Sequence, residues 1–439
     1  MTDDRHPFLR AFGPGLLFAG AAVGVSHLVQ STRAGAGYGL SLLVVVLVAN
    51  LLKYPAFRFG SLYAAATGHS LLEGYRRQGR WALWLYGLLT LATMFTVAAA
   101  VTVVTAGLLG MLIGVRDHPL ALSAVLLVVC GVILAVGRFV WLDRVIKVVV
   151  AILTVATLVA AGLAVPHLDF AGARWWPDVA HFSAADFAFV AALVGWMPSA
   201  VDVAVWQSLW TLAKADANQT SGLALDQPDA RAARRARLAA VRIDFDVGYT
   251  ATALLAFCFV VLGAAVMYGS GQAPAATATG FAEQIITLYA AMLGQWARPL
   301  IAVAAFAVMF STTLTVMDGF PRALATLRAR LRSPEKAGEA LLESRDGMRA
   351  YWAALLVVAL GALAVLGALP RSLPALIDLA TTLSFLTAPI LAWLNHRAVH
   401  GAEVPPDARP SRFLSWFSRV GMLFMGGFAV WYLIMRWAI

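Results

Sequence analysis

The sequence of 439 residues is 61% hydrophobic and only 13% charged, whereas a soluble protein carries about 25% charged residues. This composition excludes a soluble globular protein and predicts an integral membrane protein. The net charge of +10 would suit a nucleic-acid partner, but the positions of the basic residues, described below, argue against one.

Eleven apolar segments are long enough to cross a bilayer, which takes about 20 mostly apolar residues per helix. In chain order they are 12–34, 40–62, 81–113, 120–136, 140–165, 187–212, 247–268, 299–319, 352–369, 373–394 and 413–435. We therefore expect an all-α fold of eleven transmembrane helices. Five form a first half (12–165), five form a second half (187–394), and one is additional (413–435). Because successive spans alternate in direction, the halves start from opposite sides, as in an inverted repeat.

The basic residues predict how the spans are oriented. With the N-terminus in the cytoplasm, all but six of the 33 Lys and Arg residues fall at cytoplasmic ends. The exceptions are Arg33, Arg116, Arg174, Arg298, Arg371 and Arg436. This bias is the positive-inside signature. It predicts a multi-pass protein of the plasma (inner) membrane with a cytoplasmic N-terminus and an external C-terminus, and it leaves no basic cluster that needs a nucleic acid.

Span 1 contains residues that a bilayer should reject. Its centre reads Gly24-Val25-Ser26-His27, and Gly and Ser weaken a helix. A freed backbone group in hydrocarbon needs a partner, so such a break survives only where protein or a wet cavity surrounds it. His27 has two readings: it bonds a freed carbonyl group, or it handles a substrate or a proton.

Span 6 is interrupted in a similar way by Met197-Pro198-Ser199, and Asp202 follows shortly after. Proline removes a backbone donor and clashes with the preceding turn. Paired interruptions in the two halves indicate a transporter's binding site. The predicted substrate site is therefore Gly24, Ser26, His27, Met197, Ser199 and Asp202. Asp202 either fixes its helix by accepting a hydrogen bond or binds a cation or relays protons.

Other segments carry further predictions. Span 8 is rich in hydroxyl groups, which either bond the preceding turn or give oxygens to Na⁺ together with carbonyl groups at the span 1 break. The candidate coupling-ion residues are Val23, Ser311, Thr312 and Thr315. Lys53 and Arg58 are expected to reach the cytoplasmic interface.

Two connections are expected to be helical. Ala230–Arg242, rich in Ala and Arg, predicts a helix near the inner membrane surface, and Phe281–Ala297 predicts an amphipathic cap helix outside. Cys130 and Cys258 lie inside spans without metal-type spacing, which predicts packing roles.

Several motifs resemble those of the Nramp family of proton-coupled divalent-metal transporters, which has the LeuT fold. They are Gly13-Pro14-Gly15, 33–43, 49–52, Met197-Pro198 and the hydroxyl-rich stretch ending Leu314-Thr315. The resemblance covers nearly the whole chain in span order. It implies a secondary transporter that works by alternating access around a metal site between spans 1 and 6.

The chain departs from the family at the site itself. Family members carry Asp-Pro-Gly-Asn at the span 1 break and Met-Pro-His in span 6, where this chain has Gly24–His27 and Met197-Pro198-Ser199. The polar ligand expected from span 10 maps to Thr381 or Thr382. Family acids of the proton route are missing from span 3, which has no acidic residue.

These departures leave the substrate open. His27, Met197 and Asp202 would form a soft site for a late transition metal, or a hydrated cation would bind loosely in a polar cavity. The alternative is a small organic solute such as an amino acid, coupled to Na⁺ or H⁺. Amide groups at the start of a half-helix suit a carboxylate, and Trp196 and Trp206 suit an organic ammonium.

The sequence thus predicts a transporter rather than an enzyme, because catalytic motifs such as HExxH and GxSxG are absent. We expect a monomer in the lipid bilayer whose partner is a metal cation or a small solute. No cofactor is expected apart from H⁺ or Na⁺ as a coupling ion.

Overall fold

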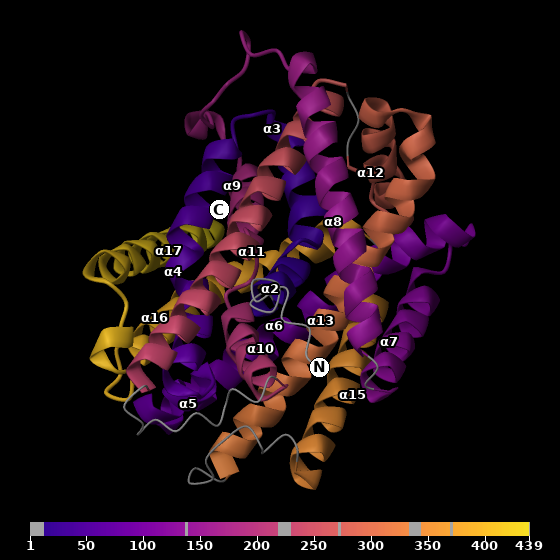
Figure 1. Cartoon of the computed structure of the whole chain (residues 1–439). Helices are drawn as coiled ribbons and strands as arrows, with labels where there is room; N and C mark the ends of the chain where they lie inside the picture. The colour runs from indigo at the N-terminus through magenta and orange to yellow at the C-terminus, as the bar shows by residue number, and fades with distance from the viewer. Residues whose placement is uncertain are drawn as a thin grey trace.

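The computed structural model describes residues 13–136, 139–217, 230–270, 274–332, 344–368 and 372–438, and these residues form helices and connecting segments without any strand (Figure 1). Eight of the described helices are long and apolar enough to cross a membrane. The predicted all-α membrane fold is therefore confirmed, while the count of eleven spans and the division into two halves stay predictions.

The helices follow the predicted spans closely. Residues 13–164 form α2 (Pro14–Ala22), a π-helical segment (Ser26–Ser31), α3 (Thr32–Tyr38), α4 (Leu43–Thr67), α5 (Leu71–Gln78), α6 (Arg80–Ile113), α7 (Pro119–Val136) and α8 (Phe139–Ala164). The rest of the described chain forms α9 (Ala184–Trp196), α10 (Val203–Ala217), α11 (Ala230–Val266), α12 (Ala278–Leu293), α13 (Arg298–Arg332), α15 (Arg345–Ala368), α16 (Leu373–Val399) and α17 (Arg412–Ala438).

Both predicted helix breaks are confirmed. Span 1 is α2 followed, after an irregular turn at Val23 and Gly24, by the π-helical segment and α3. Span 6 is α9 and α10, separated by residues 197–202. The carbonyl end of α2 and that of α9 therefore both lie inside the bundle.

Glycine residues let both pieces of span 1 pack against α11. A Cβ atom on Gly15 would lie 2.0 Å from the Asp244 carbonyl oxygen, and one on Gly35 would lie 2.0 Å from the Val260 carbonyl oxygen. On the α11 side, a Cβ atom on Gly248 would lie 2.3 Å from the Gly15 carbonyl oxygen. Such contacts leave no room for a side chain, so backbone-to-backbone packing explains Gly15 of the Gly-Pro-Gly motif and Gly35 of the Gly-Ala-Gly motif.

Replacing Gly35 by alanine is expected to destabilise the protein by about 1–3 kcal/mol, the usual effect of overpacking. Its Cβ atom would also lie 2.7 Å from the Ala264 backbone nitrogen, so a backbone segment would have to move. Gly37→Ala is the matched control, because nothing lies within 4 Å of the new Cβ atom. The melting temperatures of the two purified variants test this prediction; equal values would contradict it.

Two expectations about the connections have different outcomes. The helix predicted at Ala230–Arg242 is not separate: it is the first part of α11, which runs unbroken to Val266. The helical state predicted for this segment is confirmed, and its place near the inner membrane surface stays a prediction. No Pro or Gly lies between Ala230 and Asp246 to separate it from the rest of α11. The helix predicted at Phe281–Ala297 is confirmed as α12, which lies at the opposite end of the bundle from α5 (Figure 1).

Candidate functional site

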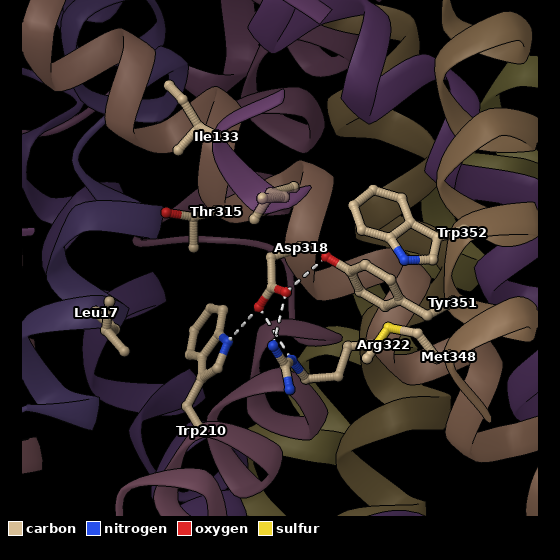
Figure 2. A pocket seen from close by; sticks show the side chains of 10 residues that line it. Leu17, Ile133, Trp210, Thr315, Asp318, Arg322, Met348, Tyr351 and Trp352 are labelled. Carbon is tan, nitrogen blue, oxygen red and sulfur yellow. Dashed lines mark hydrogen bonds and ion pairs between the residues drawn. The ribbon is translucent and has the colours of Figure 1, made fainter. Parts of the chain in front are cut away.

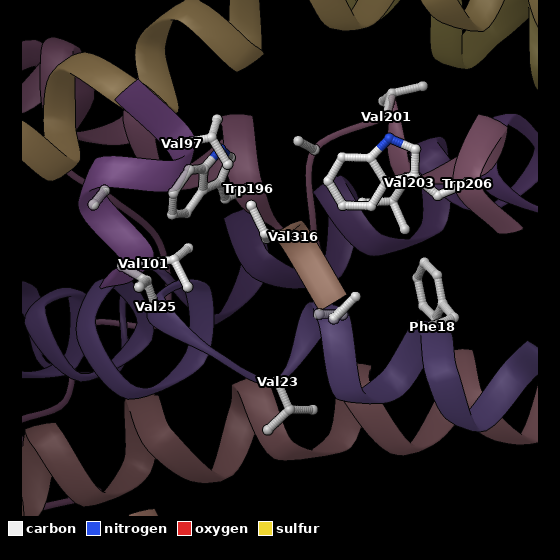
Figure 3. Close-up of a cluster of buried hydrophobic side chains, with 14 of the residues drawn as sticks. Phe18, Val23, Val25, Val97, Val101, Trp196, Val201, Val203, Trp206 and Val316 are labelled. Carbon is white, nitrogen blue, oxygen red and sulfur yellow. The ribbon is translucent and has the colours of Figure 1, made fainter. Parts of the chain in front are cut away.

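A small cavity of about 30 Å³ lies where the two broken spans meet. Most of its wall is apolar and includes Val25, Val97, Val101, Trp196, Trp206 and Val316. Figure 3 shows Val316 projecting between the two tryptophan rings. The polar residues of the wall are Ser26, Ser199, Asp202 and Thr312. Three residues predicted for the substrate site (Ser26, Ser199 and Asp202) and one predicted for the coupling ion (Thr312) therefore line the same cavity.

Asp202 is the acidic residue of this wall and immediately precedes α10. Its side chain is 4% exposed, and its Oδ1 atom has no hydrogen-bond partner in the described part of the chain. The backbone amides of Asp202 and Val203 face the same carboxylate group. Asp202 therefore stabilises the start of α10 and keeps one carboxylate oxygen available to a ligand, because buried polar atoms normally have a partner.

His27 is engaged on both ring nitrogens. Nδ1 lies 2.7 Å from the Ser26 hydroxyl group, and Nε2 lies 2.8 Å from the Thr252 carbonyl oxygen on α11. The Ser26 hydroxyl group also donates to the Ala22 carbonyl oxygen at 2.5 Å, at the carbonyl end of α2. His27 is not part of the cavity wall. Its contacts hold the break of span 1 against α11.

Met197 and Gly24 have packing surroundings. Met197 is fully buried in an apolar cluster with residues such as Ala34 and Phe385 and does not line the cavity. A Cβ atom on Gly24 would lie 2.8 Å from the Thr312 side chain, so glycine permits α13 to approach the break. Of the three residues predicted to form a soft metal site, Asp202 lines the cavity, whereas His27 and Met197 do not. The described residues contain no group of three or more His, Cys, Asp or Glu side chains that could hold a metal ion.

Lys53 is a residue whose position the sequence analysis predicted wrongly. It was expected to reach the cytoplasmic interface, but it is 1% exposed in the middle of the bundle. Its ammonium group donates to three backbone carbonyl oxygens at the end of α9, with Nζ–O distances of 2.8 Å to Val194, 2.9 Å to Gly195 and 3.1 Å to Ser199. The expectation was wrong because these acceptors, created by the break in span 6, lie far away in the sequence.

The predicted coupling-ion residues gather only in part. The Thr312 hydroxyl group donates to the Gly20 carbonyl oxygen at 2.8 Å, and the Val23 carbonyl oxygen lies 3.5 Å from it. Ser311 lies close to Gly20 as well, since a Cβ atom there would be 3.6 Å from its Oγ. Thr315 instead bonds the Ser311 carbonyl group of its own helix and lines a different cavity.

A partly buried network joins α3 to α16 on the predicted outer side. Arg33 forms a two-pronged ion pair with Asp378, with N–O distances of 2.7 and 3.0 Å. Gln30 bonds Arg33, Asp378 and the Thr381 hydroxyl group, and the Arg33 guanidinium group lies 4.9 Å from the centre of the Phe189 ring. This pairing ties the second piece of span 1 to span 10.

The predicted span 10 ligands, Thr381 and Thr382, do not line the central cavity. Thr381 lies against α9, where a Cβ atom on Gly195 would be 2.0 Å from its carbonyl oxygen. Ser384 of α16 contacts the wall residue Trp196, whose indole group donates a 2.8 Å hydrogen bond to the Ser384 hydroxyl group. This contact was not predicted from the sequence.

A larger cavity of about 320 Å³ lies further along α13. Thr315, Asp318 and Arg322 line it from α13, and Trp210 and Tyr351 line it from α10 and α15. Figure 2 shows the Asp318 carboxylate at its centre. That group accepts hydrogen bonds from Trp210 at 3.1 Å, from Tyr351 at 3.0 Å and from Arg322 at 2.8 and 3.0 Å. This full set of partners agrees with a structural role for Asp318.

The sequence is similar to those of known proteins over nearly its whole length. The family model described as "Natural resistance-associated macrophage protein-like" matches residues 15–435. An uncharacterised protein of Pasteurella multocida (strain Pm70) is 32% identical over 438 residues, which cover 97% of this chain and 92% of that protein.

Solved structures share the fold at low sequence identity. A manganese transporter of Eremococcus coleocola is 14% identical with a TM-score of 0.71, covering 98% of this chain and 87% of that one. MHP1, a nucleobase-cation-symport-1 family transporter, is 13% identical with a TM-score of 0.56, covering 97% and 92%. MhsT, solved with L-phenylalanine, is 15% identical with a TM-score of 0.51, covering 96% and 97%. The chain therefore has the fold of these transporters.

Proposed function

Because the chain belongs to the Nramp family and is a membrane transporter rather than an enzyme, we propose that it carries a hard divalent cation such as Mn²⁺ or Mg²⁺. The proposed location is the plasma (inner) membrane, with the N-terminus in the cytoplasm and the C-terminus outside. The proposed site is the central cavity between the two broken spans, and the proposed mechanism is alternating access around it.

One observation carries the proposal: a buried carboxylate oxygen of Asp202 without a partner belongs to the wall of a cavity of ionic size. A volume of about 30 Å³ matches roughly one water molecule, whereas pockets for organic ligands measure about 300–1,000 Å³. An ion with little of its hydration shell would fit in this conformation, and an amino acid would not.

The donor atoms around the cavity favour hard cations. The polar wall residues offer a carboxylate oxygen from Asp202 and hydroxyl oxygens from Ser26, Ser199 and Thr312. Mg²⁺ and Mn²⁺ prefer such oxygen ligands, whereas thiolate, thioether and imidazole groups select softer metals. Because neither Met197 nor His27 lines the cavity, a soft site for a late transition metal is the weaker alternative.

The surroundings supply the two closures that alternating access needs. On the predicted outer side, the Arg33–Asp378 pair joins α3 to α16. On the predicted cytoplasmic side, the larger cavity begins at Thr315, one turn of α13 beyond Thr312, and its Asp318 carboxylate bonds both α10 and α15. We propose that opening the first set of contacts admits the cation and that separating the second releases it.

The second candidate function is transport of a small organic solute such as an amino acid. The indole rings of Trp196 and Trp206 line the central cavity, and aromatic faces attract organic ammonium groups. MhsT, which shares the fold, was solved with L-phenylalanine. This function would require the cavity to widen several-fold when the outer contacts open.

Reconstitution in liposomes tests the proposal. We expect the purified chain to admit Mn²⁺ or Mg²⁺, recorded by a metal-sensitive dye inside the vesicles, and to show no thermal shift with a panel of amino acids. A thermal shift with a zwitterion, combined with no uptake of either metal, would contradict the cation proposal and support the second candidate.

A further inference from the structure

The two half-helices that meet at the centre pose the same physical problem. The last carbonyl groups of α2 and of α9 have no partner within their own helix, and the helix dipole makes these ends negative. In lipid such groups need donors or cations. The chain solves the problem differently at the two ends.

At the end of α2, the donor is neutral. The hydroxyl group of Thr312 on α13 donates to the Gly20 carbonyl oxygen at 2.8 Å, and the Ser26 hydroxyl group donates to the Ala22 carbonyl oxygen at 2.5 Å. The backbone amide of Gly24 also donates to the Ala22 carbonyl oxygen, at 2.9 Å, so every donor named at this buried half-helix end is neutral.

At the end of α9, the donor is an ammonium group. Lys53 of α4 offers three N–H donors and bonds three converging carbonyl oxygens within 3.1 Å, so its donors are fully used. Three backbone oxygens around one point, at an unwound half-helix, are the arrangement that transporters of this architecture use for Na⁺. In this chain the Lys53 ammonium group occupies the position between the three oxygens.

The charge itself requires an explanation beyond helix capping. Burying an ammonium group is costly, and at the α2 end neutral hydroxyl and amide donors serve instead. The same interrupted segment carries Asp202, whose carboxylate interacts with the charge of Lys53. Lys53 therefore balances Asp202 when the central cavity holds no cation.

We propose that the Lys53 ammonium group is a tethered cation that occupies a monovalent-ion position formed by the carbonyl groups of Val194, Gly195 and Ser199. Transport by this chain therefore needs no Na⁺ at that position. Removing the ammonium group exposes the position to Na⁺ from solution. The inference concerns the transporter fold and holds for either class of transported solute.

Thermal stability of the purified full chain tests the proposal. Melting temperatures are measured in NaCl and in choline chloride at equal ionic strength. We expect no difference for the unmodified chain. For Lys53→Met, which keeps the length of the side chain without its charge, we expect a lower melting temperature in choline that Na⁺ raises by at least about 2 °C, as a ligand of the folded state does.

Arg58→Met is the matched control, because it also removes a cation from α4. The Arg58 guanidinium group bonds Tyr54 rather than α9. Its melting temperature should not depend on the choice of Na⁺ or choline. If Lys53→Met does not fold, the unmodified chain still tests the proposal. A higher melting temperature of the unmodified chain in NaCl than in choline chloride would overturn it. A folded Lys53→Met that no monovalent cation stabilises would overturn it as well, and neither result depends on metal uptake.

Discussion

Replacing Asp202 by asparagine is expected to lower the apparent affinity for Mn²⁺ or Mg²⁺ by about 30-fold or more. Removing one member of a buried charge pair costs about 2–5 kcal/mol, and each 1.4 kcal/mol is a factor of ten. Asparagine keeps the shape of the side chain and favours the start of a helix as aspartate does, so α10 should form normally. Concentration-dependent metal uptake into liposomes measures the effect.

Asp346→Asn is the control for this experiment. Asp346 lies in the exposed first turn of α15, so the substitution removes the same charge at a place that does not line the central cavity. We expect its uptake to equal that of the unmodified chain. If Asp202→Asn folds and retains the affinity of the unmodified chain, Asp202 is only a helix-stabilising residue and the proposed cation site is wrong.

Much of the fold could be predicted because the bilayer restricts what a sequence can do. Long apolar runs predicted α6, α7 and α16 with boundaries close to those found. The breaks were visible because Gly24 and Pro198 stand out against an otherwise continuous apolar pattern. These signals are local, so they do not depend on knowing which helices touch.

The site was predicted less completely because its chemistry depends on distant contacts. Asp202, Ser26 and Ser199 could be identified from their place at the breaks. The role of Lys53 could not, since its carbonyl partners are backbone groups that any residue would supply. His27 had two readings, and its contact with the Thr252 carbonyl oxygen, which lies far away in the sequence, favours the structural one.

A second large effect is expected for Glu73→Gln, on stability rather than on transport. Glu73 of α5 is 3% exposed and accepts hydrogen bonds from Arg76 at 2.7 and 2.8 Å and from Arg77 at 3.0 Å. Arg330, itself 3% exposed at the end of α13, lies 3.2 Å from the same carboxylate. Breaking a buried ion pair by removing one partner costs about 3–5 kcal/mol, and we expect the melting temperature to fall accordingly.

The pH dependence of this effect has a defined sign. Burial works to raise the pKa of Glu73, but the hydrogen bonds from Arg76 and Arg77 and the charge of Arg330 outweigh it, so the pKa lies below its ordinary value. A lowered carboxylate pKa gives stability that is fully present above the ordinary value of about 4.3 and is lost as the pH falls through the lowered value. The difference in melting temperature between the unmodified chain and Glu73→Gln should therefore be constant between about pH 6 and 8.

Asp178→Asn is the control, because Asp178 also pairs with a cation, Arg174 at 3.1 Å, but in an exposed connection. Solvent screens an exposed ion pair, so this variant should melt close to the unmodified chain. Both substitutions exchange a paired carboxylate for an amide of the same shape, but Glu73 is buried among three arginine residues whereas Asp178 is exposed. Equal melting temperatures for Glu73→Gln and Asp178→Asn would show that α5 is not held to α13 by charge.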